Sequence, residues 1–399
     1  MNSEQAKTSI GTNATEEKAG HLSLGTVLRR IGLSLGTTLI FLIIALFVLL
    51  ATIAHGPSQT IRDTLVLSAM QASATKWVPG LFLDQELVDQ IVQDSLSSDK
   101  TSVDINDFHQ HYVYETTPDG EVIVVPVQPG TNPDQIQKDE WEGAIDGMRY
   151  FTMSGTTYKA YILLVKDPSR VYVGTSSDFK SGKTGIRVFD IASRENCVAV
   201  INGGEFNDEN GVGTGDTPIG LTYSKGNCVW NDGKKTNFIG IDENNNLVVK
   251  HTLTKEEAEE LKIRDGVSFQ TGNVLIDHSG DKVNLYYSGG NTGLAQRTAI
   301  GQRADGTMIL VVTDGRTASA LGATHDDIIN LMVQLGAVTA GMLDGGSSAM
   351  MYYEDYYDKY NMNKDLLDSY QLQGLVNKYK AFTRPRRIPT FFCVRPLAD

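Results

Sequence analysis

The stretch RTAIGQRADGTMILVVTDGR, residues 297–316, decides the fold of the largest part of this chain. Its second half contains the apolar run Met308–Thr313, which predicts a β-strand. The pair Asp305-Gly306 stands just before that run and is typical of the turn of a hairpin. An arginine opens the stretch, and a carboxylate and a second arginine close it. The stretch therefore predicts a hairpin with charged side chains at its ends.

Further runs of the same kind lie on both sides of this hairpin and are separated by Gly, Asp and Asn turns. They cover residues 158–165, 171–174, 197–201, 237–241, 247–249 and 391–394. Helical patterns are few. Thr324 with Asp327 three residues later forms a capping box, and Gly336 ends the apolar pattern that follows. A second helix is expected over 254–262. Residues 141–399 are therefore predicted to form an α+β domain, with a mainly antiparallel sheet and a few flanking helices.

The N-terminal part of the chain contains a charge-free apolar segment, Ile31–Ala54, which is long enough to cross a bilayer as a helix. Arg29 and Arg30 precede it, and basic residues beside a first span usually stay in the cytoplasm. We therefore expect residues 1–30 to be a cytoplasmic tail and the C-terminal domain to lie outside the cytoplasm. A cleaved signal peptide is the competing interpretation, although its apolar region would be shorter.

Residues 55–140 are expected to form a connecting region with a helix over 83–96 and a strand over 121–127. The chain of 399 residues is 41% hydrophobic and can bury a core, and its net charge of −13 argues against a nucleic-acid partner. It has three cysteines. Cys197 and Cys228 could form one disulfide bridge. The favoured interpretation is that all three cysteines are small buried hydrophobic residues.

Polar residues and glycines follow several predicted strands at the point where each strand ends, where side chains can converge on a cleft. Asn202 to Glu205 follow one strand, and Asp344 to Ser348 follow another. The order G-G-S-S does not fit the nucleophile elbow of a serine hydrolase. The glycines at 211–215 do not form a dinucleotide-binding motif.

Arginines suit phosphate, because a guanidinium group makes two parallel hydrogen bonds to it. Arg297 and Arg316 at the ends of the hairpin are therefore candidate phosphate ligands. The helix that begins after Thr324 offers free N–H groups to an anion. Plain capping by Asp326 and Asp327 explains that helix start equally well.

Taken in order, these segments resemble the phosphodiester glycosidase family, which includes the uncovering enzyme and membrane-anchored bacterial proteins. The resemblance covers about residue 141 to the C-terminus. It rests on 202–204, 297–301, 314–316, 322–324, 335–337, 343–346 and 386–389. Two positions depart from the family pattern, because Glu205 replaces a phenylalanine and Ser347 replaces a glycine.

The resemblance implies hydrolysis of a sugar-1-phosphodiester on the sugar side, in an envelope glycan or exopolysaccharide. Asp344 is the first candidate for nucleophile or base, with Glu205 and Asp314 as rivals. The expected substrate- and phosphate-binding residues are Asn202, Gly203, Gly204, Arg297, Thr298, Arg316, Thr324, Gly345 and Gly346.

No cofactor is firmly implied. A divalent cation is left open, because Asp216, Asp314 and Asp344 offer oxygen ligands, but their spacing matches no known metal loop. The alternative function is a non-catalytic envelope module that binds phosphate-linked glycans or assists exopolysaccharide assembly. The carboxylates at the strand ends favour the enzyme.

Overall fold

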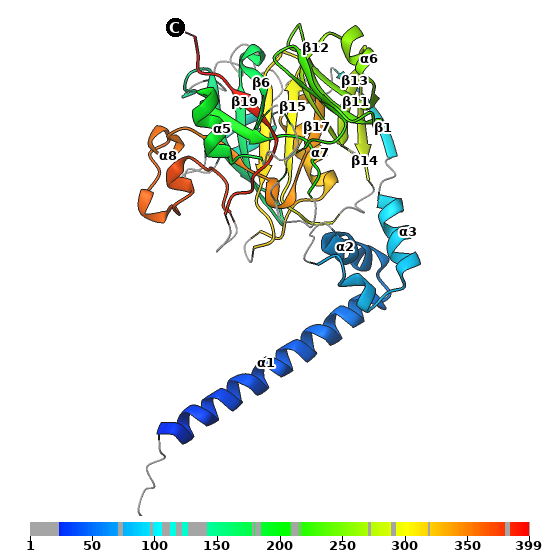
Figure 1. Cartoon of the computed structure of the whole chain (residues 1–399), viewed down its shortest axis with the longest axis vertical. Coiled ribbons are helices and arrows are strands. Elements are labelled where there is room, and N and C mark those ends of the chain that lie inside the picture. Colours follow the sequence, from blue (N-terminus) through cyan, green and yellow to red (C-terminus); the bar gives the residue numbers. More distant parts are fainter. Residues whose placement is uncertain are drawn as a thin grey trace, which may run out of the picture. The chain divides into compact units, whose positions relative to one another are not determined.

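The computed structural model describes residues 24–70, 75–95, 99–105, 112–116, 122–126, 141, 143–177, 179, 185–208, 215, 217–269, 273–288, 293–317, 320–379 and 384–398. The chain forms two units, one up to Gly56 and the other from Pro57 onward. Figure 1 shows the elements of the second unit, with strands at its centre and helices at its periphery.

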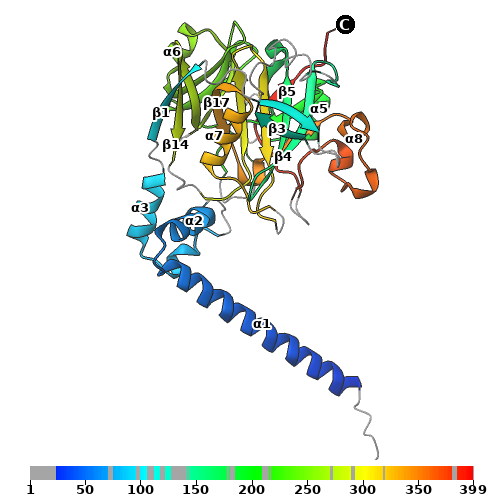
Figure 2. The same cartoon turned by 180° about the vertical axis from the view of Figure 1, so that it is seen from behind.

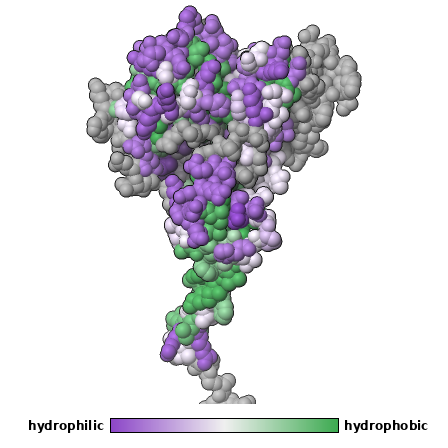
Figure 3. Space-filling view, turned by 90° about the vertical axis from the view of Figure 1, so that its right-hand side faces the viewer, coloured by the Kyte–Doolittle hydropathy of each residue, from purple (hydrophilic) through white to green (hydrophobic). Residues whose placement is uncertain are grey.

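The first unit contains one long helix, α1 (Leu24–Ala54), which has 31 residues. Within the described residues it is the helix that is long and apolar enough to cross a membrane. Most of its leucine, isoleucine and phenylalanine side chains are exposed, and its surface is hydrophobic over most of its length (Figure 3). The helix begins seven residues before the predicted span and includes Arg29 and Arg30. Residues 1–23 of the predicted tail lie outside the described residues.

An eight-stranded antiparallel sheet is the largest element of the second unit. In spatial order its strands are β1 (Asp99–Asp104), β14 (Lys282–Tyr287), β13 (Val274–Ser279), β17 (Ala337–Leu343), β15 (Thr298–Arg303), β16 (Met308–Thr313), β5 (Lys159–Val165) and β4 (Met148–Ser154). The stretch 297–316 supplies β15 and β16, which pair as the predicted hairpin.

Strand β16 is continuously apolar because both faces of this sheet are covered. Leu310 and Val312 belong to the central core, which this sheet shares with the two smaller sheets. Ile309 and Val311 belong to a second core beneath helix α7 (His325–Gln334). Figure 2 shows α7 lying across that face. Every side chain of β16 is buried, so its position in the middle of the fold follows from the apolar run.

Two smaller antiparallel sheets pack on the other side of the central core. One consists of β11 (Leu247–Leu253), β10 (Thr236–Asp242), β12 (Ile263–Phe269), β8 (Leu221–Ser224) and β9 (Asn227–Asn231). The other consists of β18 (Met351–Tyr353), β7 (Ala199–Asn202), β19 (Thr390–Val394) and β6 (Val171–Thr175). Their outer faces carry α6 (Lys255–Glu260) and α5 (Val188–Glu195), respectively.

The remaining described elements are short. They are the pair β2 (Tyr112–Thr116) and β3 (Val122–Pro126), the helix α8 (Tyr356–Lys359), and the 3₁₀ helices η3 (Pro168–Arg170), η5 (Gly346–Ser348), η6 (Lys364–Leu366) and η7 (Gln371–Gln373).

The predicted connecting region contains α2 (Gln59–Met70), the 3₁₀ helix η1 (Pro79–Leu81) and α3 (Gln85–Ser95). It also supplies β1, which pairs with β14 across about 180 residues of sequence. Part of the region predicted as a connector is therefore built into the main sheet of the domain. A pairing so distant in sequence leaves no local pattern from which it could be predicted.

The α+β class, the antiparallel sheets and the apolar N-terminal helix are confirmed. Both predicted capping boxes are present, at Thr324 and at Thr254. All three cysteines lie in the described part of the chain and are free thiols. Cys197 contacts the Tyr172 hydroxyl at 3.2 Å and does not pair with Cys228.

Candidate active site

The ends of β7 and β17 meet, and this brings two of the predicted segments together. The Asn202 side-chain N–H donates to the main-chain carbonyl of Asp344 at 2.6 Å, and the Asp344 N–H donates to Gly203 O at 3.1 Å. Asn202 is fully buried, and its side-chain oxygen accepts from the Thr298 hydroxyl at 2.7 Å and from Met350 N at 3.1 Å. Asn202 thus joins three strand ends and fixes the loop of Asp344.

The two glycines after Asn202 allow neighbouring strands to come close together. A Cβ on Gly203 would lie 2.6 Å from the Thr390 hydroxyl, and one on Gly204 would lie 2.8 Å from Ser268 O. These contacts are shorter than a side chain tolerates. The sequence suggested that the glycines admit a ligand, but in the structure the space beside them is filled by protein.

The Asp344 carboxyl group lies partly buried at the start of the turn that contains η5. Burial raises its pKa, hydrogen bonds from the Ser348 side chain and the Gly345 N–H lower it, and the charge of Glu205 raises it; the resulting pKa is about 7. A carboxyl group with this pKa exchanges its proton near neutral pH, as a general acid or base must. Glu205 is also partly exposed, and its charge acts on Asp344, so two carboxyl groups lie near each other.

Arg316 supplies positive charge beside this turn. Its backbone adopts the left-handed conformation, with φ of 57°, and its Nη1 lies 3.8 Å from the place of a Cβ on Gly346. Burial lowers the pKa of its guanidinium group. Within the described residues, its buried Nη2 has no hydrogen-bond partner. A buried guanidinium N–H without a partner is costly, and an anion would satisfy it.

A second arginine, Arg386, reaches the turn from the C-terminal segment. Its Nη1 lies 3.4 Å from the Ser348 hydroxyl, and it forms an ion pair with Asp208. The Tyr379 hydroxyl donates to Ser347 O at 2.5 Å and accepts from Arg386 N at 3.2 Å. Burial raises the pKa of Tyr379 to about 12, and Asp344 contributes to that rise.

Sequence reasoning missed Tyr379, Arg386 and Ser348 as site residues. Arg386 did carry a signal, since it belongs to one of the matched family segments. Tyr379 lies in a stretch without a motif and could not have been found from the sequence alone.

Arg297 lies behind Arg316 and is 5% exposed. Its Nε donates to Ala323 O at 3.0 Å and its Nη2 donates to Gly293 O at 2.6 Å. Burial and the charge of Arg316 lower its pKa to about 10. The structure therefore uses the Arg297 side chain to hold backbone carbonyl groups, whereas the sequence suggested a direct phosphate ligand.

Asp314 and Thr324 are two further predicted site residues, and both bond to protein groups in the structure. Asp314 is 6% exposed, and its two oxygens accept from the Tyr161 hydroxyl at 2.6 Å and from Lys378 N at 3.2 Å. Burial raises the pKa of this carboxyl group, and the Tyr161 hydrogen bond opposes that rise. The Thr324 hydroxyl donates to Asp327 at 2.7 Å and accepts from Asp327 N at 3.1 Å, which caps α7.

Of the three expected oxygen ligands for a cation, Asp314 and Asp344 lie in the part of the chain that the structure describes. No group of three or more His, Cys, Asp or Glu residues there could hold a metal ion. Asp216, one of the three candidates, lies outside the described residues. The prediction that a divalent cation binds here is therefore not tested.

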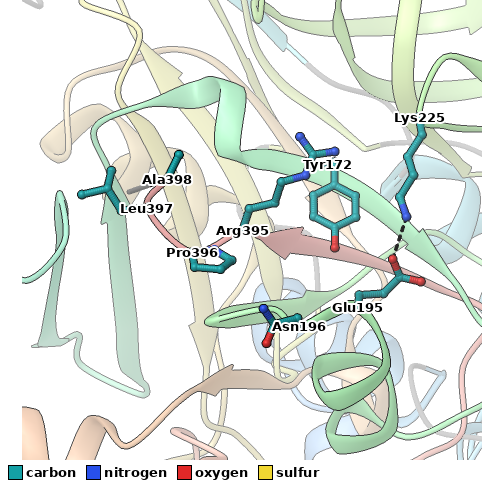
Figure 4. A pocket seen from close by; sticks show the side chains of 8 residues that line it. All are labelled: Tyr172, Glu195, Asn196, Lys225, Arg395, Pro396, Leu397 and Ala398. Atoms are coloured by element: carbon teal, nitrogen blue, oxygen red, sulfur yellow. Dashed lines mark hydrogen bonds and ion pairs between the residues drawn. The ribbon is translucent and has the colours of Figure 1, made fainter.

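A separate surface cavity of about 410 Å³ lies near the C-terminus (Figure 4). It is lined by Tyr172, Glu195, Asn196, Lys225 and residues 395–398. Lys225 forms an ion pair with Glu195 at 2.6 Å across its wall. The cavity lies at the end of β19 that is remote from Thr390, and it contains none of the predicted site residues.

The fold and the site together describe an α+β domain with paired carboxyl groups and arginines at strand ends. Residues 195–395 match the model of the phosphodiester glycosidase family, which is about half of the chain. The chain belongs to this family.

The chain is 41% identical over 61 residues to the SPbeta prophage-derived uncharacterized protein YomE of Bacillus subtilis. That match covers 15% of this chain, and the chain spans only 10% of that relative.

Several solved structures are similar to this chain. The zebrafish N-acetylglucosamine-1-phosphodiester α-N-acetylglucosaminidase catalytic domain, auto-inhibited by its pro-peptide, has a TM-score of 0.46 at 17% identity, covering 75% of this chain and 83% of that chain. A putative exported protein from Burkholderia pseudomallei has a TM-score of 0.41 at 14% identity, covering 78% and 88%.

Proposed function

We propose that this protein hydrolyses a sugar-1-phosphodiester by breaking the bond between the sugar and the phosphate. The observation that carries the proposal is that Asp344 and Arg316 both border the turn at Gly345 and Gly346. A carboxyl group with a pKa of about 7 lies beside a buried guanidinium N–H that has no partner among the described residues. Family membership supports the same chemistry on phosphate-linked sugars.

Arg316 and Arg386 are the proposed phosphate ligands. Both guanidinium groups approach the turn of η5, one beside Gly346 and the other at the Ser348 hydroxyl. Bidentate hydrogen bonds to a phosphate stabilise the charge that develops as the phosphate departs. Asp208 balances the charge of Arg386, which leaves Arg316 as the stronger attraction for the anion.

Asp344 and Glu205 are the proposed carboxyl groups at the sugar. As the C1–O bond breaks, the phosphomonoester leaves with the bonding electron pair and C1 becomes positive. The ionised form of either carboxyl group stabilises that charge. Asp344 accepts the proton of the attacking water, whose hydroxyl joins C1, or itself attacks C1 in a two-step route. Phosphate is a good leaving group, so a strong acid is not required.

The remaining predicted residues are proposed to position these groups. Asn202 and Thr298 fix the backbone of Asp344, while Arg297 adds positive potential behind Arg316. Gly346 donates its N–H to Gln296 O at 2.9 Å, which fixes the turn against the start of β15.

The test uses the full chain and a panel of sugar-1-phosphodiesters in water enriched in ¹⁸O. The proposal expects the label in the released sugar and none in the phosphate, with activity lost in Asp344→Asn. Asp281→Asn, at an exposed turn, is the matched control and should be as active as the unmodified chain. Label in the phosphate would show a phosphodiesterase that cleaves the phosphorus–oxygen bond, and the proposal would fail.

We also propose that α1 anchors the chain in a membrane with the domain outside the cytoplasm, where envelope glycans and exopolysaccharides are found. The arginines Arg29 and Arg30 near its N-terminal end support that orientation. Protease added to intact cells should then digest the domain. Protection of the domain in intact cells, with digestion after lysis, would contradict the orientation.

A further inference from the structure

The helices between the anchor and the domain carry exposed apolar side chains. Val66, Leu67, Val88 and Ile91 form the small core between α2 and α3. On the outside, Ile61 is 57%, Trp77 is 64% and Leu81 is 55% exposed. Such exposure costs free energy in water, and clustered exposed apolar residues commonly mark a contact surface. We call residues 59–70 and 75–95 together the proximal hairpin.

The proximal hairpin is attached to the candidate active site. The Leu294 N–H donates to the Ser68 hydroxyl of α2 at 2.9 Å. Gly293 touches the backbone of α2 so closely that a Cβ there would lie 2.2 Å from Ser68 N. The carbonyl of Gly293 accepts from Arg297, the residue behind Arg316. The loop of residues 293–297 therefore contacts α2 at one end and reaches Arg297, near the site, at the other.

An apolar residue also stands at the edge of the site. Leu321 is 55% exposed, and its carbonyl accepts from the Arg316 N–H at 3.0 Å. Two residues further on, Ala323 pairs with Ala295, next to the Leu294 that α2 holds. Leu321 thus stands beside the arginine proposed to bind phosphate, and backbone contacts through Ala323, Ala295 and Leu294 lead from it to α2.

Chain length limits how far this surface can be from the end of α1. Helix α2 begins at Gln59, five residues after Ala54. Five residues span at most about 18 Å, and the rise along α2 to Ser68 adds about 14 Å. If α1 spans a bilayer, Ser68 is within about 32 Å of the end of that helix. The chain therefore tethers Ser68, and the loop that contacts it, within reach of the membrane surface.

We infer that the proximal hairpin lies on the lipid surface and that the substrate is a sugar phosphodiester whose second ester group is a lipid. The inference rests on the proposed function. Trp77 with Lys76 beside it has the chemistry of an interfacial anchor, with an amphipathic ring and a charge that reaches water. The lipid chain stays in the bilayer near Leu321, the phosphate meets Arg316, and the sugar meets Asp344.

The first experiment locates the proximal hairpin by tryptophan fluorescence. The full chain, with Trp141→Phe and Trp230→Phe, is placed in phosphatidylcholine nanodiscs with brominated acyl chains. Emission from Trp77 should fall at least about twofold against unbrominated lipid, because the ring lies at the interface. The matched protein with Trp77→Phe and Trp141→Phe retains Trp230 and should change little. Equal responses from the two proteins would overturn the placement.

The second experiment tests the substrate class in the same nanodiscs. Turnover is compared between a sugar-1-phosphate ester of a long-chain alcohol in the bilayer and the methyl ester in water. The double variant Trp77→Glu, Leu81→Glu should lower kcat/KM about tenfold or more for the lipid ester alone, because it loses interfacial contact. Leu366→Glu, at a leucine elsewhere that is 78% exposed, is the control and should change neither value.

If the double variant lowered kcat/KM equally for both esters, or left both values unchanged, the inference would be overturned while the proposed function stands. Absence of turnover of either ester by the unmodified chain would overturn the proposed function and the substrate class together. The fluorescence result would then still decide whether the proximal hairpin lies on the bilayer.

Discussion

Replacement of Asp344 by asparagine should stabilise the folded chain at alkaline pH while abolishing hydrolysis. Burial and the charge of Glu205 hold the pKa of Asp344 at about 7 in the folded chain, against about 3.9 for an unperturbed aspartate. The folded state therefore binds this proton more tightly than the unfolded state. The contribution of the group to stability is complete below about pH 4 and is lost as the pH rises to about 7.

The upper limit of this effect is about 4 kcal/mol at pH 8, because each pKa unit corresponds to about 1.4 kcal/mol. Asp344 is partly open to solvent, so screening reduces the expected gain for Asp344→Asn to about 1–3 kcal/mol. For a domain of this size, that gain raises Tm by about 2–6 °C.

The assay is thermal unfolding followed by circular dichroism at several pH values from 4 to 8. The difference in Tm between Asp344→Asn and the unmodified chain should be near zero at pH 4 and grow until about pH 8. Asp281→Asn, at an exposed position, should show no such growth. A Tm difference that stays constant over this range would refute the argument that burial and Glu205 destabilise the ionised carboxyl group.

Four further changes separate the proposed roles. Arg316→Ala should lower kcat/KM for a sugar phosphodiester about 10²-fold and leave a phosphate-free aryl glycoside unaffected, since the loss is of phosphate stabilisation; an equal fall on both would argue against phosphate binding. Glu205→Gln removes a negative charge that raises the pKa of Asp344, so the pH–rate profile should shift to lower pH, and an unmoved profile would contradict the coupling. Asn202→Ala leaves buried partners without hydrogen bonds and should lower the free energy of unfolding by about 1–3 kcal/mol, measured in denaturant titrations. Asp314→Asn should retain kcat/KM within about tenfold, because its oxygens bond to protein groups; loss as complete as in Asp344→Asn would place Asp314 in the chemistry.

Local patterns were enough to predict the main strands and the caps of two helices. The run Met308–Thr313 became β16 with the predicted bounds, because a short apolar run that follows a turn signal favours a strand buried on both faces. Thr324 with Asp327 gave the start of α7. These features depend on residues that are neighbours in sequence, which is why a single sequence reveals them.

The roles of the site residues could not be predicted as well, because they depend on partners far away in the chain. Arg297 carries the right chemistry for phosphate, but the carbonyls of Gly293 and Ala323 already accept its hydrogen bonds. Arg386 and Tyr379 reach the site from a segment whose path no local pattern indicates. The predicted proximity of Asn202 and Asp344 was realised because both follow strands that end at the same place.

Strand β1 has a consequence for how the domain behaves when it is separated from its anchor. It pairs with β14 over six residues, from Asp99 with Tyr287 to Asp104 with Lys282. Without it, β14 would be an edge strand with free N–H and C=O groups, available to pair with a second molecule. With β1 in place, β1 itself is the edge strand, and its charged residues Asp99, Lys100 and Asp104 oppose pairing with a second molecule. Cleavage after residue 104 would instead expose the more apolar β14, and we expect that fragment to self-associate more readily than one cleaved before residue 99. The segment that tethers the domain also protects it from aggregation.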